Sequence, residues 1–368
     1  MGIVILIVVV CGCLCGFLLF RNKTLPPASP SPGSEARTLT VIVPARNEEV
    51  NLPHLLESLA AQTLRPTEVI VVDDCSEDRT RQIAERYGAT VIAGSPPPPD
   101  WTGKNWAVWN GYAASTGDVL VFLDADVRLE PGALASLVRA RDACHGVVSV
   151  VPYHRPVRFY EKLSMITNVL GAFAFTSPFE RTNARKGLYG ACIVASRADY
   201  DNVNGHASVK SEVLDDLFLG SRFMEAGVPV SNYLGGGLVS FRMYPHGIRS
   251  EVEGFSKGAA LSTSTLSPWT VLPTAVWTVG LLASEFALFA LAYAWSWPLF
   301  AAYALCTLQL AYFARSVGRF GLAIPLLHAL SSLFFVAVML VSLFQVLVLR
   351  RVVWKGRHIE VGGGNRER

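Results

Sequence analysis

Residues 118–126 read DVLVFLDAD, five apolar residues that lead directly into Asp124, Ala125 and Asp126. A short β-branched and aromatic run that ends in polar residues is typical of a buried strand. Similar runs precede it, LTVIVPA at 39–45 and EVIVVDD at 68–74. Helical stretches are expected near 48–61, 78–87, 103–115 and 131–142. Because strands alternate with helices, the sequence predicts an α/β fold with a doubly wound, mostly parallel sheet.

An acidic cluster follows each of these three runs. In doubly wound sheets, ligands bind at the carboxyl ends of the strands, which is where these clusters lie. Pro44 and Glu48 follow the first run, and Glu48 also suits an ordinary first helical turn, where the dipole favours acids. Asp73 and Asp74 end the second run, and helix capping does not explain two adjacent carboxylates. A carboxylate at this place can accept hydrogen bonds from a nucleobase or a ribose.

Asp124 and Asp126 form an Asp-X-Asp pattern at the end of the third run. Two carboxylates this close repel each other unless a cation lies between them. Mg²⁺ and Mn²⁺ prefer such oxygens and share them with substrate phosphates, so we expect a divalent metal here. Lys104 follows Gly103 at a predicted helix start and suits contact with a phosphate, although a solvated lysine is equally ordinary.

Asp215 and Asp216 lie in a helical pattern, LDDLFLG at 214–220. A carboxylate next to a substrate cleft could act as a general base toward an acceptor. Two exposed helix acids would give the same pattern, so both interpretations stay open.

Composition indicates that part of the chain lies in lipid. Hydrophobic residues make up 51% of the 368 residues and charged residues only 17%, against about 25% in soluble domains. Residues 3–20 are uncharged and long enough to span a bilayer, so residues 1–21 are expected to be an anchor. Arg21 and Lys23 follow, which predicts a cytoplasmic location for the rest of the chain. A Pro/Ser linker at 22–36 then precedes the catalytic domain, expected at 37–257.

The C-terminal region 268–349 contains three hydrophobic runs, at 271–294, 299–314 and 322–349. Three spans would place the basic tail, 350–368, outside the cell, against the positive-inside rule. Two spans with 299–314 re-entrant or interfacial would keep it inside, and the sequence leaves both open. The net charge of +3 is too small to favour nucleic acid, and the seven cysteines form neither a disulfide framework nor a zinc pattern.

These clusters, in this order, resemble the family-2 glycosyltransferases, which have the GT-A fold. The resemblance implies an inverting, metal-dependent hexosyltransferase in which Pro44, Glu48, Asp74, Lys104 and Asp124 bind a UDP-sugar. It further implies that Asp124 and Asp126 hold Mn²⁺ or Mg²⁺. Asp216, or Asp215 beside it, would be the base. The QxxRW element of processive synthases is absent, which argues against a polymerase.

A narrower resemblance is to the family-2 enzymes that glycosylate a C30 carotenoid acid. It rests on VPYH at 151–154, RFYE at 158–161, FRMY at 241–244, EGFSK at 253–257, VGRF at 317–320 and WKGR at 354–357. It implies transfer of glucose from UDP-glucose to a carboxyl group, at the bacterial cell membrane. Residues 159–179 suit an interfacial helix next to such an acceptor.

Two other functions remain open at this point. A polyprenyl phosphate or hopanoid acceptor would require the same cytoplasmic motifs. A transporter or scaffold would carry charged residues within the spans, where Glu285 is the only acid.

Overall fold

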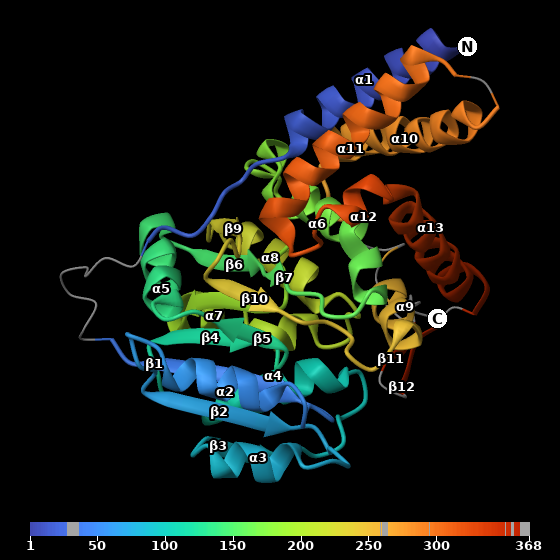
Figure 1. Cartoon of the computed structure of the whole chain (residues 1–368). Helices are drawn as coiled ribbons and strands as arrows, with labels where there is room; N and C mark the ends of the chain where they lie inside the picture. Colours follow the sequence, from blue (N-terminus) through green and yellow to red (C-terminus); the bar gives the residue numbers. More distant parts are fainter. Residues whose placement is uncertain are drawn as a thin grey trace, which may run out of the picture. The chain divides into compact units, whose positions relative to one another are not determined.

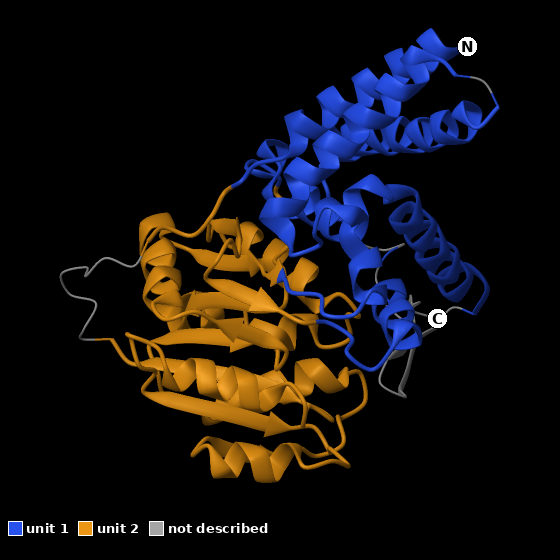
Figure 2. Ribbon diagram, in the orientation of Figure 1, with its two compact units in different colours: residues 1–22, 154–183, 243–368 blue, residues 23–153, 184–242 orange. Residues whose placement is uncertain are grey.

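The computed structural model describes residues 1–27, 37–257, 259, 264–293, 295–349, 351–354 and 357–360 (Figure 1). The chain divides into two compact units (Figure 2). Residues 23–153 and 184–242 form the sheet unit, and residues 1–22, 154–183 and 243–368 form the helical unit. Most of the expected linker at 22–36 and of the expected basic tail at 350–368 lies outside the described residues.

The sheet unit is built on seven strands in the order β3-β2-β1-β4-β8-β6-β9. Their bounds are β1 Leu39–Ala45, β2 Glu68–Asp73, β3 Thr90–Ala93, β4 Val119–Leu123, β6 Val147–Val151, β8 Cys192–Ser196 and β9 Val230–Leu234. Strand β1 lies parallel to both β2 and β4, and β8 runs antiparallel between β4 and β6. The predicted α/β fold with a mostly parallel sheet is therefore confirmed, with β8 as its reversed strand.

Helices cover both faces of this sheet, because alternate strand residues point to opposite sides. Val41 and Val43 pack in one core, against α2 (Leu52–Ala60) and α5 (Ala133–Cys144), whereas Ile42 belongs to the other core. That second core includes side chains of α4 (Gly103–Ala114), α7 (Arg197–Asn202), η4 (Gly205–Val209) and α8 (Asp215–Glu225). The second face therefore brings α4, η4 and the start of α8 to the carboxyl end of β4.

The remaining elements of the sheet unit are short. Helix α3 (Thr80–Arg86) follows β2, and a three-stranded sheet contains β5 (Val127–Leu129), β10 (Val239–Phe241) and β7 (Tyr153–His154). Val127 pairs with Phe241, and the amide of Arg242 donates to the carbonyl of Asp126 at 3.4 Å. This pairing fixes the backbone directly after the Asp-X-Asp pattern.

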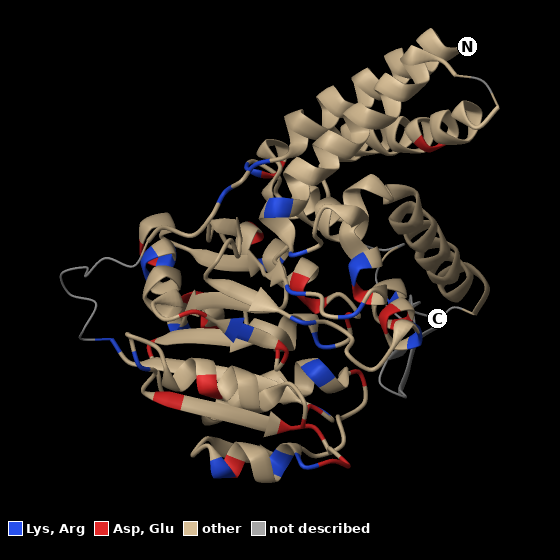
Figure 3. Ribbon diagram, in the orientation of Figure 1, with Lys and Arg blue, Asp and Glu red and all other residues tan. Residues whose placement is uncertain are grey.

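Within the described residues of the helical unit, four helices are long and apolar enough to cross a membrane: Gly2–Leu19 (α1), Pro268–Leu291 (α10), Trp297–Val317 (α11) and His328–Leu349 (α13 with η5). Figure 3 shows few charged residues along them. Helix α11 has 21 residues, more than the run at 299–314 suggested. A Cβ added to Gly12 of α1 would lie 2.9 Å from the Cα of Gly280 on α10, so these helices need glycine where they meet.

The other elements of this unit are η2 (Tyr160–Ser164), α6 (Met165–Thr176), η3 (Pro178–Glu180), α9 (Ile248–Ser256), α12 (Ala323–Leu326), β11 (Arg351–Trp354) and β12 (Arg357–Glu360). The stretch 159–179, expected as an interfacial helix, forms η2 and α6 and begins η3. It clusters with the hydrophobic helices, as does α9, although both lie within the range 37–257 expected for the catalytic domain.

Candidate active site

The loops after β1 and β2 are tied together by hydrogen bonds. Asn47 adopts φ 54°, and its side-chain oxygen accepts the amide of Glu77 at 2.9 Å. The amide of Asn47 donates to the hydroxyl of Ser76 at 3.0 Å, and the amide of Glu48 donates to the hydroxyl of Thr80 at 2.8 Å. Two loops far apart in sequence therefore form one surface at the carboxyl ends of neighbouring strands.

This surface carries two of the predicted nucleotide-binding acids. Asp74 is 8% exposed, its amide donates to the carbonyl of Ala45, and its Oδ2 lies 4.0 Å from Nη1 of Arg46. Glu48 accepts a hydrogen bond from the side chain of Asn51 at 2.9 Å. Both carboxylates are thus oriented by the fold, and carboxylate oxygens in such loops are suited to the N–H and O–H groups of a nucleoside.

A cavity lies next to this surface, lined by Pro44, Lys104, Val108, Phe122, Leu123, Asp124, Gly190, Ile193, His206 and Asp215. Lys104 is the second residue of α4, whose first turn is capped by Thr102. Its Nζ lies 2.8 Å from Oδ1 of Asp124, with 30% of the lysine side chain and 33% of the aspartate side chain exposed. The cavity therefore combines one lysine with two carboxylates, those of Asp124 and Asp215, and the three side chains come from separate segments.

The two carboxylates that line this cavity outnumber its one lysine. Burial lowers the pKa of Lys104, but the charges of Asp124 and Asp215 outweigh it and hold the pKa well above its usual value. Burial and the charge of Asp126 raise the pKa of the Tyr189 hydroxyl. Lys104 is accordingly charged at any physiological pH and Tyr189 is neutral.

The Asp-X-Asp carboxylates fit a hard divalent cation by chemistry, because such ions prefer carboxylate oxygens. They also fit by charge, because the neighbouring aspartates outnumber Lys104. Within the described ranges, no group of three or more His, Cys, Asp or Glu side chains could hold a metal ion. A cation at Asp124 and Asp126 would therefore need further oxygens, which the phosphates of a nucleotide sugar can supply.

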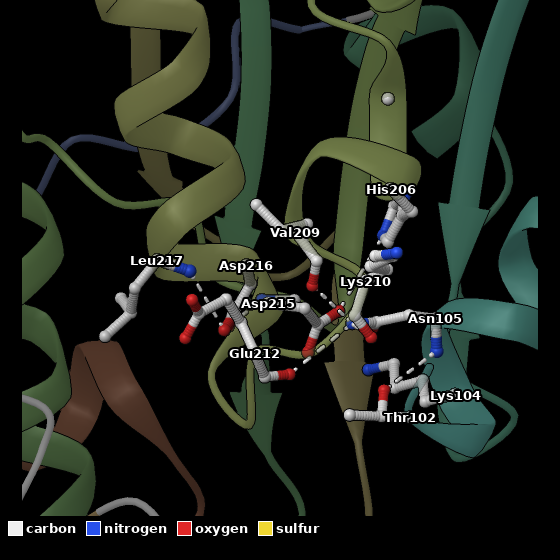
Figure 4. Close-up of polar contacts among 12 residues, drawn as sticks. Thr102, Lys104, Asn105, His206, Val209, Lys210, Glu212, Asp215, Asp216 and Leu217 are labelled. Carbon is white, nitrogen blue, oxygen red and sulfur yellow. Dashed lines mark hydrogen bonds and ion pairs between the residues drawn. The ribbon is translucent and has the colours of Figure 1, made fainter. Parts of the chain in front are cut away.

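The two adjacent aspartates at the start of α8 have different partners (Figure 4). The carboxylate of Asp216 accepts the amides of Gly190, at 2.8 Å, and of Leu217, at 3.0 Å. Asp215 is 7% exposed and lines the cavity with Lys104. Asp216 is thus held beside Gly190, a lining residue of the cavity, whereas Asp215 itself lines the cavity.

Sequence reasoning did not identify Tyr189, Gly190 or His206 as members of this site. Gly190 and Tyr189 lie directly before β8, the antiparallel strand that the alternating pattern did not reveal. His206 lies nine residues before Asp215 in a segment without strong periodicity. The turn residues Asn204 and Gly205 beside it were the one signal that this segment has a fixed backbone.

The sequence is similar to known glycosyltransferases along most of its length. A model of glycosyl transferase family 2 matches residues 40–203. The 4,4'-diaponeurosporenoate glycosyltransferase of Staphylococcus haemolyticus is 33% identical, over 94% of this chain and 95% of the relative. The enzyme of the same name from Staphylococcus aureus strain USA300 is 32% identical, over 97% of each chain.

Among solved structures, a mannosyltransferase from Pyrobaculum calidifontis in complex with GDP-Man and Mn2+ matches 95% of this chain and 100% of its own. The TM-score is 0.54 at 20% sequence identity. At this identity the match is evidence of the fold alone, and it confirms the predicted GT-A fold with additional helices.

Proposed function

This chain belongs to glycosyl transferase family 2, and we propose that it transfers glucose from UDP-glucose to the carboxyl group of 4,4'-diaponeurosporenoate, a C30 carotenoid acid. One observation carries the choice of acceptor. The similarity to enzymes named for this substrate covers 94–97% of the chain, so it includes the hydrophobic helices as well as the sheet unit. A carotenoid acid resides in a bilayer, and an enzyme that uses it needs an apolar region of this kind.

The donor would lie along the carboxyl ends of β1, β2 and β4. Glu48 and Asp74 would accept hydrogen bonds from the uridine, beside Pro44, and Lys104 would face the diphosphate. Asp124 and Asp126 would hold Mn²⁺ or Mg²⁺, which when bound offsets the negative charge of the departing UDP. The closeness of Lys104 to Asp124, 2.8 Å, supports this arrangement, because the lysine and a cation held by Asp124 would then both lie near the diphosphate.

The reaction would be a single displacement with inversion. A carboxylate oxygen of the acceptor forms a bond to the anomeric carbon while the bond from that carbon to the diphosphate oxygen breaks, and UDP leaves. A carboxylic acid of ordinary pKa is already ionised at neutral pH, so no base has to remove a proton. Asp216 would then position the acceptor, and the catalytic gain would come mainly from orientation.

The same proposal includes a location at the bacterial cell membrane, with the sheet unit in the cytoplasm. The four apolar helices and the cations Arg21 and Lys23 after α1 support it. UDP-sugars are soluble and the acceptor is not, so the two substrates would meet at the membrane surface.

Purified full-length protein in lipid nanodiscs, with radiolabelled UDP-glucose and the carotenoid acid, tests the proposal. We expect a labelled lipid that releases its sugar on mild alkaline hydrolysis, because a glycosyl ester is base-labile and a glycoside is not. A base-stable product, or label only on an added polyprenyl phosphate or hopanoid, would replace the carotenoid acid with another acceptor.

A further inference from the structure

Three buried polar residues at the donor cavity form a row in which each lies next to the following one. Tyr200 on α7 is 0% exposed, His206 on η4 is 2% exposed, and Asp215 at the start of α8 is 7% exposed. Asp215 and His206 both line the cavity. Buried polar side chains need hydrogen-bond partners, so their arrangement is constrained by the fold.

The hydrogen bonds around Tyr200 fix the proton of the imidazole. The hydroxyl oxygen of Tyr200 accepts the backbone amide of His206 at 3.0 Å and lies 2.7 Å from Nδ1 of the same residue. Among the described residues Nδ1 is the one acceptor within reach of this buried hydroxyl, so the hydroxyl proton is directed at Nδ1. A neutral ring then carries its own proton on Nε2. Burial lowers the pKa of His206 to about 4, despite the opposing charge of Asp215, so the ring is neutral at pH 7.

The protonated Nε2 faces Asp215, with 3.7 Å between Nε2 and Oδ2. This separation is slightly longer than a hydrogen bond, but in a low-dielectric site the N–H dipole still favours one orientation of the carboxylate. Asp215 and Lys104 line the same cavity. The contacts therefore run from Tyr200 to His206 and on to Asp215, which lies with the lysine at the cavity wall.

The surrounding packing holds this row rigid. The ring of Phe122 on β4 stacks on Tyr200, with centroids 5.1 Å apart, and also contacts His206 at 5.5 Å. Gly205 has φ 40°, and an added Cβ would lie 2.1 Å from the Tyr200 ring, so this position requires glycine. The buried side chain of Asn105 on α4 donates to the carbonyl of Val209 at 2.8 Å, which ties η4 to the helix that carries the lysine.

We propose that His206, with its tautomer set by Tyr200, is a positioning residue that orients Asp215 and thereby Lys104 toward the diphosphate of the donor. This inference rests on the proposed function only in assuming that the cavity binds a nucleotide diphosphate. It makes no assumption about the acceptor.

The test compares two substitutions that keep different halves of the imidazole. In His206→Asn the amide group stands near the place of Nδ1, so the contact with Tyr200 persists and the group facing Asp215 is lost. In His206→Gln the amide nitrogen reaches the place of Nε2 and still donates toward Asp215. We expect His206→Asn to weaken UDP binding, measured by calorimetry, and to raise KM for UDP-glucose by roughly 10-fold to 100-fold. His206→Gln should recover most of that loss.

A double-mutant cycle separates positioning from general loss of structure. If His206 acts through Asp215, then His206→Asn should have no further effect on UDP affinity in an Asp215→Asn background. Tyr200→Phe should reproduce part of the His206→Asn effect, and it supplies the same test should His206→Asn not fold. Tyr112→Phe is the matched control, because that hydroxyl bonds to Asp201 outside the row.

Wild-type UDP affinity in both His206→Asn and Tyr200→Phe, or an effect of His206→Asn that adds fully to that of Asp215→Asn, would overturn the inference. Its outcome is independent of the acceptor. If the protein binds UDP but glycosylates no carotenoid acid, the proposed function is refuted, and the double-mutant cycle still tests the role of His206. Protein that glycosylates the acid while His206→Asn binds UDP normally refutes the inference alone.

Discussion

Removal of the charge on Asp216 should affect an alcohol acceptor far more than an acid acceptor. An alcohol has a pKa far above neutrality and needs a base, which contributes about 10²–10⁴-fold to the rate. A carboxylic acid is ionised at pH 7 and needs none. We therefore expect Asp216→Asn to lower kcat by about 10²–10⁴-fold on the alcohol analogue of diaponeurosporenoic acid. On the acid itself the loss should be no more than about tenfold, the part due to misplacement.

The structure also predicts a cost that is the same for both acceptors. Asp216 accepts the amides of Gly190 and Leu217, and an asparagine can accept only one of them while its NH₂ group faces the other. Loss of one hydrogen bond to a charged acceptor costs about 1.5–3 kcal/mol. The Tm of the variant should therefore fall, and this fall must be measured so that it is not mistaken for loss of a base.

The assay measures kcat of wild type, Asp216→Asn and Asp215→Asn on both acceptors at saturating UDP-glucose. Asp215 lines the donor cavity together with Lys104, so Asp215→Asn should reduce both activities by the same factor. Equal loss on both acceptors for Asp216→Asn would refute a base role for this residue. A loss confined to the alcohol in Asp215→Asn would transfer that role to Asp215. Preference of the wild-type enzyme for the alcohol would contradict the glycosyl-ester reaction.

EDTA should abolish transfer, and Mn²⁺ or Mg²⁺ should restore it. Asp126→Asn should be inactive with an unchanged circular dichroism spectrum. Full activity after exhaustive chelation would exclude a role for the metal. Asp74→Ala should weaken UDP binding, measured by calorimetry, by about 1–3 kcal/mol, the usual cost of a lost hydrogen bond to a charged group. An unchanged affinity would show that another residue binds the uracil. Burial, with the charge of Glu161, raises the pKa of Glu251 to about 8, from an ordinary 4.5. Between these two pH values the unfolded chain loses a proton that the folded chain keeps, so the stability of the wild-type protein falls as pH rises. The Tm of Glu251→Gln minus that of wild type should therefore increase from pH 5 to pH 8. A constant difference would show that Glu251 is not protonated in the folded state.

The strands and helices that position the site follow from local sequence. Residues 39–45 were expected as a strand and form β1 with the same bounds, because a β-branched run between polar segments has few other stable structures. Predicted helices near 48–61, 78–87, 103–115 and 131–142 are observed as α2, α3, α4 and α5, with the first beginning four residues later than expected. At that end, Asn47 takes a left-handed conformation to join the two loops, which propensity does not reveal.

The relation between Asp215 and Asp216 could not be predicted, since it depends on partners distant in sequence. Asp216 is bound by Gly190, 26 residues earlier, through a strand whose antiparallel direction is set by tertiary pairing. His206 was missed for the same reason, because a lone histidine in a turn-rich segment has no periodic signal. Its contact with Tyr200 needs the left-handed backbone at Asn204 and Gly205.

The acceptor is tested most directly by lipid mass spectrometry of cells that make 4,4'-diaponeurosporenoate, with and without this chain. We predict that cells with the chain convert the carotenoid acid to a species heavier by one hexose less water, which mild alkali returns to the free acid. Cells that carry Asp126→Asn should retain the unmodified acid. An unmodified acid in cells with the active chain, together with a sugar on a different lipid, would contradict the proposed function.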